Sequence, residues 1–195
     1  RIRAITLPAS FAVSKLAATG AAEISGNTSG RVANKGMEGL AITPDGRTLV
    51  GFEQSPLIQD GGDGGRANRI VAIDLATGAS KQYVYDNRLI DKNKNYNSRE
   101  ILAVNNSKFL VLERDGKGLG DGSAAVVKRL YLIDLTGATD VSAMSGEANL
   151  LPFAVPKTLF LDIKTALNAH GILDTEIPAK LEGATFGPDV TIDGV

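Results

Sequence analysis

Two stretches of this 195-residue chain repeat each other at a spacing of about 60 residues. RIVAIDLATGA at 69–79 corresponds to RLYLIDLTGAT at 129–139. TLVGFE at 48–53 corresponds to FLVLER at 109–114, with a slip of one residue. Repeats of this length indicate that one supersecondary unit is stacked several times along the chain.

Each unit reads as short apolar strands separated by turns rich in Gly, Asp and Asn. A third unit opens at 180–190, where KLEGATFGPDV repeats the GMEGLAITPDG of 36–46. Strands are predicted at 37–42, 48–53, 69–75, 81–86, 99–104, 109–114, 129–135 and 157–163, with one more possible at 1–7. Residues 9–35, rich in Ala, Ser, Gly and Thr, predict a loop-rich N-terminal segment.

One helix is predicted near 162–170. Ile163, Ala166, Leu167 and His170 follow helical spacing there, and Gly171 suits the position just after a helix end. Because only one helix is predicted, a parallel α/β sheet with a helix after nearly every strand is disfavoured.

The strands 69–75 and 129–135 are apolar on both faces. An open antiparallel sheet usually keeps one face polar, whereas a propeller blade between two others buries both. The sequence therefore predicts an all-β fold, a β-propeller of four-stranded blades. About two and a half blades are present, and closure takes at least four. We expect residues 1–195 to form a single partial propeller domain whose open edges are covered by missing blades or by a protein partner.

Composition excludes several classes of protein. The net charge is −1, which supplies no electrostatic attraction for nucleic acid. No apolar run approaches the roughly 18–20 residues of a membrane span. The absence of cysteine rules out disulfides and thiolate chemistry. The chain shows no secretion signal, and because it begins with Arg1 rather than Met, Arg1 is not expected to be the translated start. Processing or trimming of the sequence would account for a missing targeting segment.

Glutamate recurs at the start of the first strand in all three units, as Glu38, Glu100 and Glu182. The innermost strands of a propeller line its channel, so these side chains are expected to converge at one mouth. A second acidic set follows the second strands: Glu53, Glu113 and Asp115, with Arg114 between the last two.

Clustered carboxylates repel, by about 4 kcal/mol for two charges 4 Å apart at an effective dielectric near 20. Such a ring is suited to Ca²⁺, which takes six to eight oxygen ligands. Arg99, Arg114 and Lys128 are then candidates to hold an anion. The alternative is that each glutamate is simply solvated beside a turn and was copied by duplication.

Other features carry less chemistry. The loops at 60–65 and 115–122 are rich in Asp and Gly, without the spacing of an EF-hand, and are interpreted as plain loops with calcium binding as the alternative. His170 is the only histidine and is expected to be structural or on the surface. No G-x-S-x-G motif is present, which disfavours serine-esterase chemistry.

Several motifs in combination resemble the phytase-like domain family, described by an esterase-like activity of phytase. They are EGLA followed by PDG, then LERD, then IDL with TGATDVS, and finally EG with FGPD, and they span residues 34–190. The resemblance implies a secreted or periplasmic β-propeller that hydrolyses phosphate or related esters.

By similarity to calcium-dependent propeller phytases, acidic channel residues would bind Ca²⁺ that holds the phosphate of a small anionic ester and activates water. The resemblance implies catalytic roles for Glu38, Glu100 and Arg114. It implies metal ligation by Glu38, Glu53, Glu100, Glu113, Asp115 and Glu182. The rival hypothesis is a non-catalytic propeller that serves as a binding or scaffold protein in an extracellular or periplasmic assembly.

Overall fold

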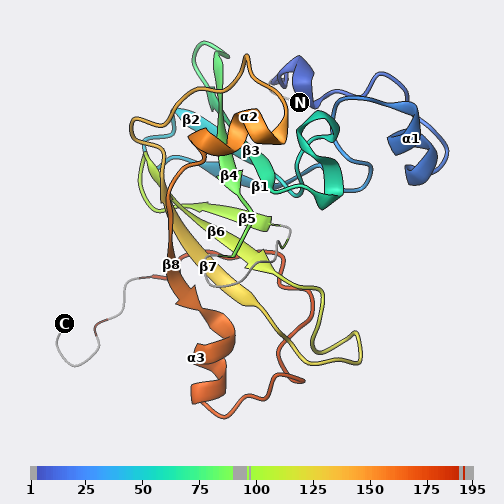
Figure 1. Cartoon of the computed structure of the whole chain (residues 1–195). Helices are drawn as coiled ribbons and strands as arrows, with labels where there is room; N and C mark the ends of the chain where they lie inside the picture. The colour runs from blue at the N-terminus through green and yellow to red at the C-terminus, as the bar shows by residue number, and fades with distance from the viewer. Residues whose placement is uncertain (1–3, 90–95, 97, 189–190, 192–195) are drawn as a thin grey trace.

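Eight strands form two four-stranded antiparallel sheets, each in sequential order (Figure 1). The computed structural model describes residues 4–89, 96, 98–188 and 191. The first sheet contains β1 (Met37–Ile42), β2 (Thr48–Glu53), β3 (Ala67–Asp74) and β4 (Ser80–Asp86). The second contains β5 (Ser98–Ala103), β6 (Lys108–Arg114), β7 (Lys128–Asp134) and β8 (Lys157–Asp162). The all-β prediction is confirmed, and each of the eight strands predicted between 37 and 163 is present.

The helices are short and few in the described part of the chain. They are α1 (Gly20–Gly26), α2 (Glu147–Leu150) and α3 (Ile163–Ala169), with 3-10 turns η1 (Ala9–Phe11), η2 (Ile58–Asp60), η3 (Gly62–Gly64) and η4 (Leu151–Phe153). The predicted helix near 162–170 is confirmed as α3. Asp162 caps its start by accepting from the Thr165 N–H at 3.0 Å, and Gly171 follows its end at φ 82°.

Two predictions in the N-terminal region were incomplete. Residues 4–7 of the possible strand at 1–7 are not in a strand, and residues 1–3 lie outside the described residues. Within the loop-rich segment, Thr19 starts α1 by accepting a hydrogen bond from the Ala22 N–H at 3.3 Å. The helix was missed because its sequence, GAAEISG, lacks an apolar stripe.

The second sheet repeats the register of the first. Glu53 is the last residue of β2 and opposes Met37, while Glu113 in β6 opposes Ser98. Thr48 pairs with Asp74 in the first sheet, as Lys108 pairs with Asp134 in the second. The two units therefore superpose without the one-residue slip expected from sequence.

A β-bulge interrupts the first strand of each sheet. The register shifts between Met37 and Gly39 in β1 and between Ser98 and Glu100 in β5. The extra residue is thus Glu38 in the first sheet and Arg99 in the second. The expected equivalence of Glu38 with Glu100 was wrong by one position, since Glu38 corresponds to Arg99. The residue that a β-ladder leaves unpaired is set by strand pairing and is not evident from the sequence repeat.

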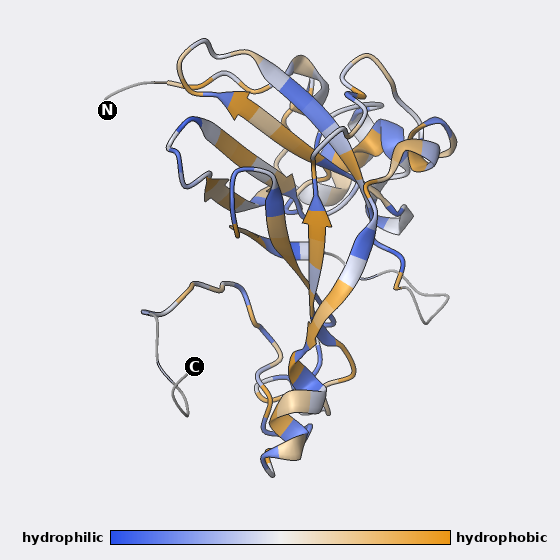
Figure 2. Cartoon of the chain, turned by 90° about the vertical axis from the view of Figure 1, so that its left-hand side faces the viewer, coloured by the Kyte–Doolittle hydropathy of each residue, from blue (hydrophilic) through white to orange (hydrophobic). Residues whose placement is uncertain are grey.

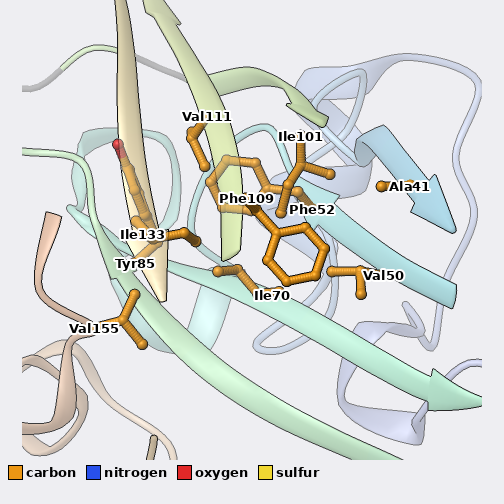
Figure 3. Packing of buried hydrophobic residues seen from close by; sticks show 10 residues of the cluster. All are labelled: Ala41, Val50, Phe52, Ile70, Tyr85, Ile101, Phe109, Val111, Ile133 and Val155. Atoms are coloured by element: carbon orange, nitrogen blue, oxygen red, sulfur yellow. The ribbon is translucent and has the colours of Figure 1, made fainter. Parts of the chain in front are cut away.

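The main core lies between the two sheets (Figure 3). Val50, Phe52 and Ile70 of the first sheet meet Phe109 and Val111 of the second, all at most 1% exposed. The ring of Phe52 packs edge-on against Tyr85, with centroids 5.2 Å apart. Burial on this scale stabilises by roughly 1.5–3 kcal/mol per large side chain.

The opposite face of the first sheet is covered by the N-terminal segment. Val71 and Ile73 point there and pack against Phe11 and Leu57, while the alternating residues Ile70 and Ala72 point into the main core. This alternation confirms that strand 69–75 is buried on both faces. Hydrophobic stretches occur on strands of both sheets, interrupted by hydrophilic residues (Figure 2).

The two sheets do not meet through equivalent faces. Ile73 faces the N-terminal segment, whereas its equivalent in the second sheet, Ile133, lies in the core between the two sheets. The sheets are therefore related head to tail rather than back to back. Two such sheets do not form a closed ring, and the propeller remains a prediction.

The connection between β7 and β8, residues 135–156, leaves its own sheet and runs over the first one (Figure 1). It covers the outer edge of β4, since the Val141 N–H donates to the Gln82 carbonyl and the Val155 N–H to the Val84 carbonyl, both at 2.9 Å. An exposed edge strand is a template for aggregation, and this cover removes it.

The opening of the third unit, at residues 181–188, adopts no strand, and residues 189 and 190 of the repeat lie outside the described residues. It nevertheless lies against the second sheet, where the Arg114 guanidinium donates to the Leu181 carbonyl at 2.7 Å.

Candidate functional site

Five polar side chains meet beside the two bulges, and we call them the bulge cluster: Glu38, Gln54, Arg99, Arg114 and Glu182. Glu38 and Arg99 are the bulged residues themselves. Gln54 and Arg114 are equivalent positions, each following the buried glutamate of a second strand. Glu182 matches Glu38 in the third unit. Bulges re-aim side chains, and here they turn Glu38 and Arg99 toward each other.

Glu38 and Arg99 form an ion pair across the two sheets, with Nη1 and Oε2 3.2 Å apart. The Gln54 amide bridges them, in the orientation that satisfies both partners. It donates to Glu38 Oε1 at 3.0 Å and accepts from Arg99 Nη2 at 2.9 Å. The Glu38 side chain is 37% exposed and that of Arg99 16%, so this pair borders solvent.

Arg114 is held more tightly. Its Nε donates to the Leu181 carbonyl at 2.7 Å and its Nη1 to the Asp115 carbonyl at 3.0 Å. Its Nη2 donates to the Glu182 carboxylate. The Arg114 side chain is 1% exposed while that of Glu182 is 54% exposed, so Glu182 covers Arg114 from the solvent side.

The charges of the bulge cluster act on one another. Burial and the neighbouring charge of Arg114 lower the pKa of Arg99, while Glu38 and Glu182 act to raise it. Two guanidinium and two carboxylate groups balance in this small volume. The cluster thus has both signs of charge, and it brings Glu38 and Glu182 of the predicted glutamate set together with Arg99 and Arg114, the arginines named as candidates to hold an anion.

Glu100 lies next to the bulge and serves the backbone of three units. Its Oε1 accepts from the Ile101 N–H at 2.8 Å, and the N–H groups of Leu40 and Ala184 also hydrogen-bond to this carboxylate. Partial burial raises its pKa, which these N–H groups act to lower. Glu100 therefore links β5 to β1 and to the segment 181–188, and it is an acid of raised pKa beside the bulge cluster.

Glu113 is buried between the sheets. It accepts from the Tyr85 hydroxyl at 2.5 Å and pairs with Lys157. The ammonium of Lys157 also lies 4.6 Å from the ring centres of both Tyr85 and Tyr131. Burial raises the pKa of Glu113, and the charge of Lys157 acts to lower it. Glu113 thus connects the first sheet, through Tyr85, to the second, through Lys157. Neither partner is a residue of the bulge cluster.

Glu53 occupies the equivalent position in the first sheet but faces the N-terminal segment. Its side chain is buried, and its Oε2 finds no hydrogen-bond partner among the described residues. Burial raises its pKa from about 4.5 to about 8, despite an opposing effect of Arg31. Desolvation explains this shift, since the charged form loses water and the charge of Arg31 offsets only part of that cost.

Glu53 should make stability fall as pH rises. Its pKa is higher in the folded protein than in the unfolded chain, so its contribution is complete below pH 4.5 and is lost progressively up to about pH 8. We expect the free energy of unfolding of Glu53→Gln, measured relative to wild type, to be more favourable at pH 8 than at pH 5. Urea unfolding at the two pH values measures this difference. An equal difference at both would contradict the assignment.

Asp115 is fully engaged in its own loop. Its Oδ2 accepts from the N–H groups of Val126 and Val127 at 2.7 and 3.0 Å, and its Oδ1 accepts from Lys128 at 2.5 Å. Lys128 is buried and also donates to the carbonyls of Lys117 and Ala179 at 2.8 and 3.2 Å. The pair fastens residues 115–128 to Ala179, just before the third unit.

The aspartates of the two Asp/Gly loops are held by contacts with neighbouring parts of the chain. Asp60 is buried and pairs with Arg69, with Oδ2 and Nε 2.6 Å apart. Asp121 accepts from the Ser123 and Gly118 N–H groups at 2.9 and 3.1 Å, which is a local turn. These contacts fit the interpretation as plain loops. His170 is exposed at the end of α3, as expected of a surface histidine.

The carboxylates do not gather as a calcium site would require. Among the residues that the structure describes, no group of three or more His, Asp or Glu side chains is placed to hold a metal ion. Glu38 and Glu182 are each paired with an arginine, and Glu53 and Glu113 are buried apart from them. In this arrangement the six predicted ligands do not fit Ca²⁺ as a set, and we derive no step through the metal.

Sequence reasoning missed the bridging Gln54 and the pairing of Lys157 with Glu113. Gln54 could have been found from its position, since it follows a repeated glutamate as Arg114 does. Lys157 offered no signal, because its contact with Glu113 depends on β8 joining the second sheet.

A family model described as phytase-like, esterase-like activity of phytase, matches residues 1–194. No curated protein and no solved structure matches the chain. In the described part of the chain, no helix is both long enough and apolar enough to cross a membrane.

Proposed function

The chain belongs to the phytase-like family, and on that premise we propose that it contributes the site of a hydrolase for small anionic esters, phosphate esters in particular. The observation that carries the proposal is the bulge cluster. It places two guanidinium groups beside a solvent-facing carboxylate at the point where three repeated units meet. Arginine suits phosphate because its planar fork matches two oxygens at once.

The residues divide the work by their surroundings. Arg99 and Arg114 hold the anionic group and stabilise the charge that develops on it. Glu38, the carboxylate at the solvent border, accepts a proton from the attacking water. Glu100 has a pKa raised by burial and protonates the leaving oxygen. The bond between phosphorus and the ester oxygen breaks, and the alcohol leaves with that proton.

Calcium dependence, implied by the family resemblance, enters the proposal as something to be measured. Bound Ca²⁺ would polarise the ester and neutralise its charge. Glu38 and Glu182 are the carboxylates that would ligate it, and each would first have to break its ion pair with an arginine. The chemistry assigned to the chain's own side chains does not depend on it.

We propose further that the two sheets are neighbouring blades of a β-propeller. The head-to-tail relation of the sheets and the recurrence of the β1 sequence at 181–188 support this. Further blades or a protein partner would cover the outer face of the second sheet, and a periplasmic or secreted location follows the family resemblance.

Glu38→Gln is expected to lower kcat/KM by about 100-fold, the lower end of what a general base contributes. Turnover of an aryl phosphate and of phytate should be followed with calcium and then with excess chelator. Glu176→Gln is the matched control, because it removes the same charge from an exposed position on the turn after α3. Its turnover should equal that of wild type.

Full activity in Glu38→Gln would remove the assigned base. No turnover of either ester by the folded protein, with or without calcium, would contradict the hydrolase and favour the alternative, a non-catalytic propeller that binds or scaffolds. Activity that survives the chelator would place the chemistry on the side chains alone.

A further inference from the structure

We infer that Glu182 is a built-in mask over an anion-binding site formed by Arg114 and Arg99. The inference rests on the proposed function, since it concerns the same cluster, and it adds how access to the arginines is controlled. The ligand class is a small oxyanion, of which inorganic phosphate is the simplest member.

The guanidinium of Arg114 is preorganised. Two of its nitrogens are fixed by the carbonyls of Leu181 and Asp115, at 2.7 and 3.0 Å. Nη2 is left to face the side chain of Glu182. A donor held in this way binds an anion without paying for its own ordering.

The contact between Glu182 and Arg114 is asymmetric. Arg114 is buried at 1% exposure, whereas Glu182 is 54% exposed. Glu182 therefore lies on the solvent side of Arg114, and rotation of the Glu182 side chain alone uncovers Nη2 of Arg114. Glu182 also sits on a segment without strand or helix, 181–188, which leaves that rotation unhindered by a sheet ladder.

Charge gives the second argument. Arg99 feels the charges of Arg114, Glu38 and Glu182 together, with a further contribution from Asp63, which itself pairs with Lys35, so the four groups of the cluster share one electrostatic environment. With both glutamates in place the charges cancel. Withdrawing one carboxylate leaves a net positive site at the border of solvent, and an incoming oxyanion restores the balance.

Calorimetric titration of inorganic phosphate into the folded protein tests the inference, with circular dichroism confirming the fold of each variant. We expect Glu182→Gln to bind phosphate at least about 10-fold more tightly than wild type, equivalent to 1.4 kcal/mol. Glu176→Gln, which changes net charge equally, should bind as wild type does. Arg99→Gln in the Glu182→Gln background should lose most of the gain.

An unchanged affinity in Glu182→Gln would overturn the mask, as would an equal gain in Glu176→Gln or a gain that survives Arg99→Gln. These outcomes are independent of turnover. Tighter phosphate binding without ester hydrolysis would uphold the mask and contradict the hydrolase. Hydrolysis with no change in phosphate affinity would do the reverse.

Discussion

Lys157→Met is expected to destabilise the folded protein by about 3–5 kcal/mol at neutral pH. Methionine preserves the length and apolar stem of the side chain but removes the ammonium that pairs with Glu113. It also removes a donor to the Asp86 carbonyl at 2.6 Å. In the variant, Glu113 Oε1 keeps only the hydrogen bond from the Tyr85 hydroxyl. Its Oε2 has no hydrogen-bond partner among the described residues even in the wild type.

The cause can be separated from lost packing by two further measurements. Adding Glu113→Gln to Lys157→Met should recover much of the loss, because the uncompensated charge is gone. The loss should also be smaller at pH 5 than at pH 8. Without Lys157 the pKa of Glu113 rises further above its unfolded value, so stability falls as pH increases. Urea unfolding gives all of these values, and a pH-independent loss with no recovery would point to packing instead.

Arg69→Met is expected to cost a similar 3–5 kcal/mol, at a second buried ion pair. Arg69 and Asp60 are 1% and 0% exposed. Arg69 also donates to the Gln82 side chain and to the Met144 carbonyl, both at 2.8 Å, and Asp60 accepts from the Gly146 N–H at 2.9 Å. Removing the guanidinium leaves a buried carboxylate with that one backbone partner from the β7–β8 connection.

The loss should have a local signature. Arg69 and Asp60 together fasten residues 141–146 over the first sheet, so limited proteolysis should cut Arg69→Met within the β7–β8 connection before the sheets unfold. Arg66→Met is the control, since Arg66 and its partner Asp86 are part-exposed and its loss should cost less than loss of the fully buried pair. Equal destabilisation of the two variants, or unchanged proteolysis, would show that burial of the pair does not decide its effect.

The strands could be predicted from sequence because their signal is local. Apolar runs bounded by Gly, Asp and Asn define β1 to β8, and double-sided burial of strand 69–75 followed from the absence of polar alternation. The helix α3 was also predicted, since apolar spacing and a following glycine agree there. The short α1 was not, because seven residues without an apolar stripe carry little pattern.

The candidate site was predicted only in part. The repeat pointed to Glu38 and Glu182, and both lie in the bulge cluster. It could not show that the bulge puts Arg99 where Glu100 was expected. A register shift of one residue is decided by backbone pairing between strands, and it turns a side chain to a different neighbour.

The sequence by itself determined the strands, the repeat and the family, because these depend on residue order along the chain. Only the tertiary structure decided the fate of each carboxylate. Glu53 and Glu113 occupy one position of the repeat, yet Glu113 pairs with Lys157 while Glu53 has its pKa raised to about 8. The physical reason is that the burial of each glutamate and the charges near it depend on the element that packs against its face of the sheet. For Glu53 that element is the N-terminal segment, and for Glu113 it is the first sheet, although the two strands have equivalent positions in the repeat.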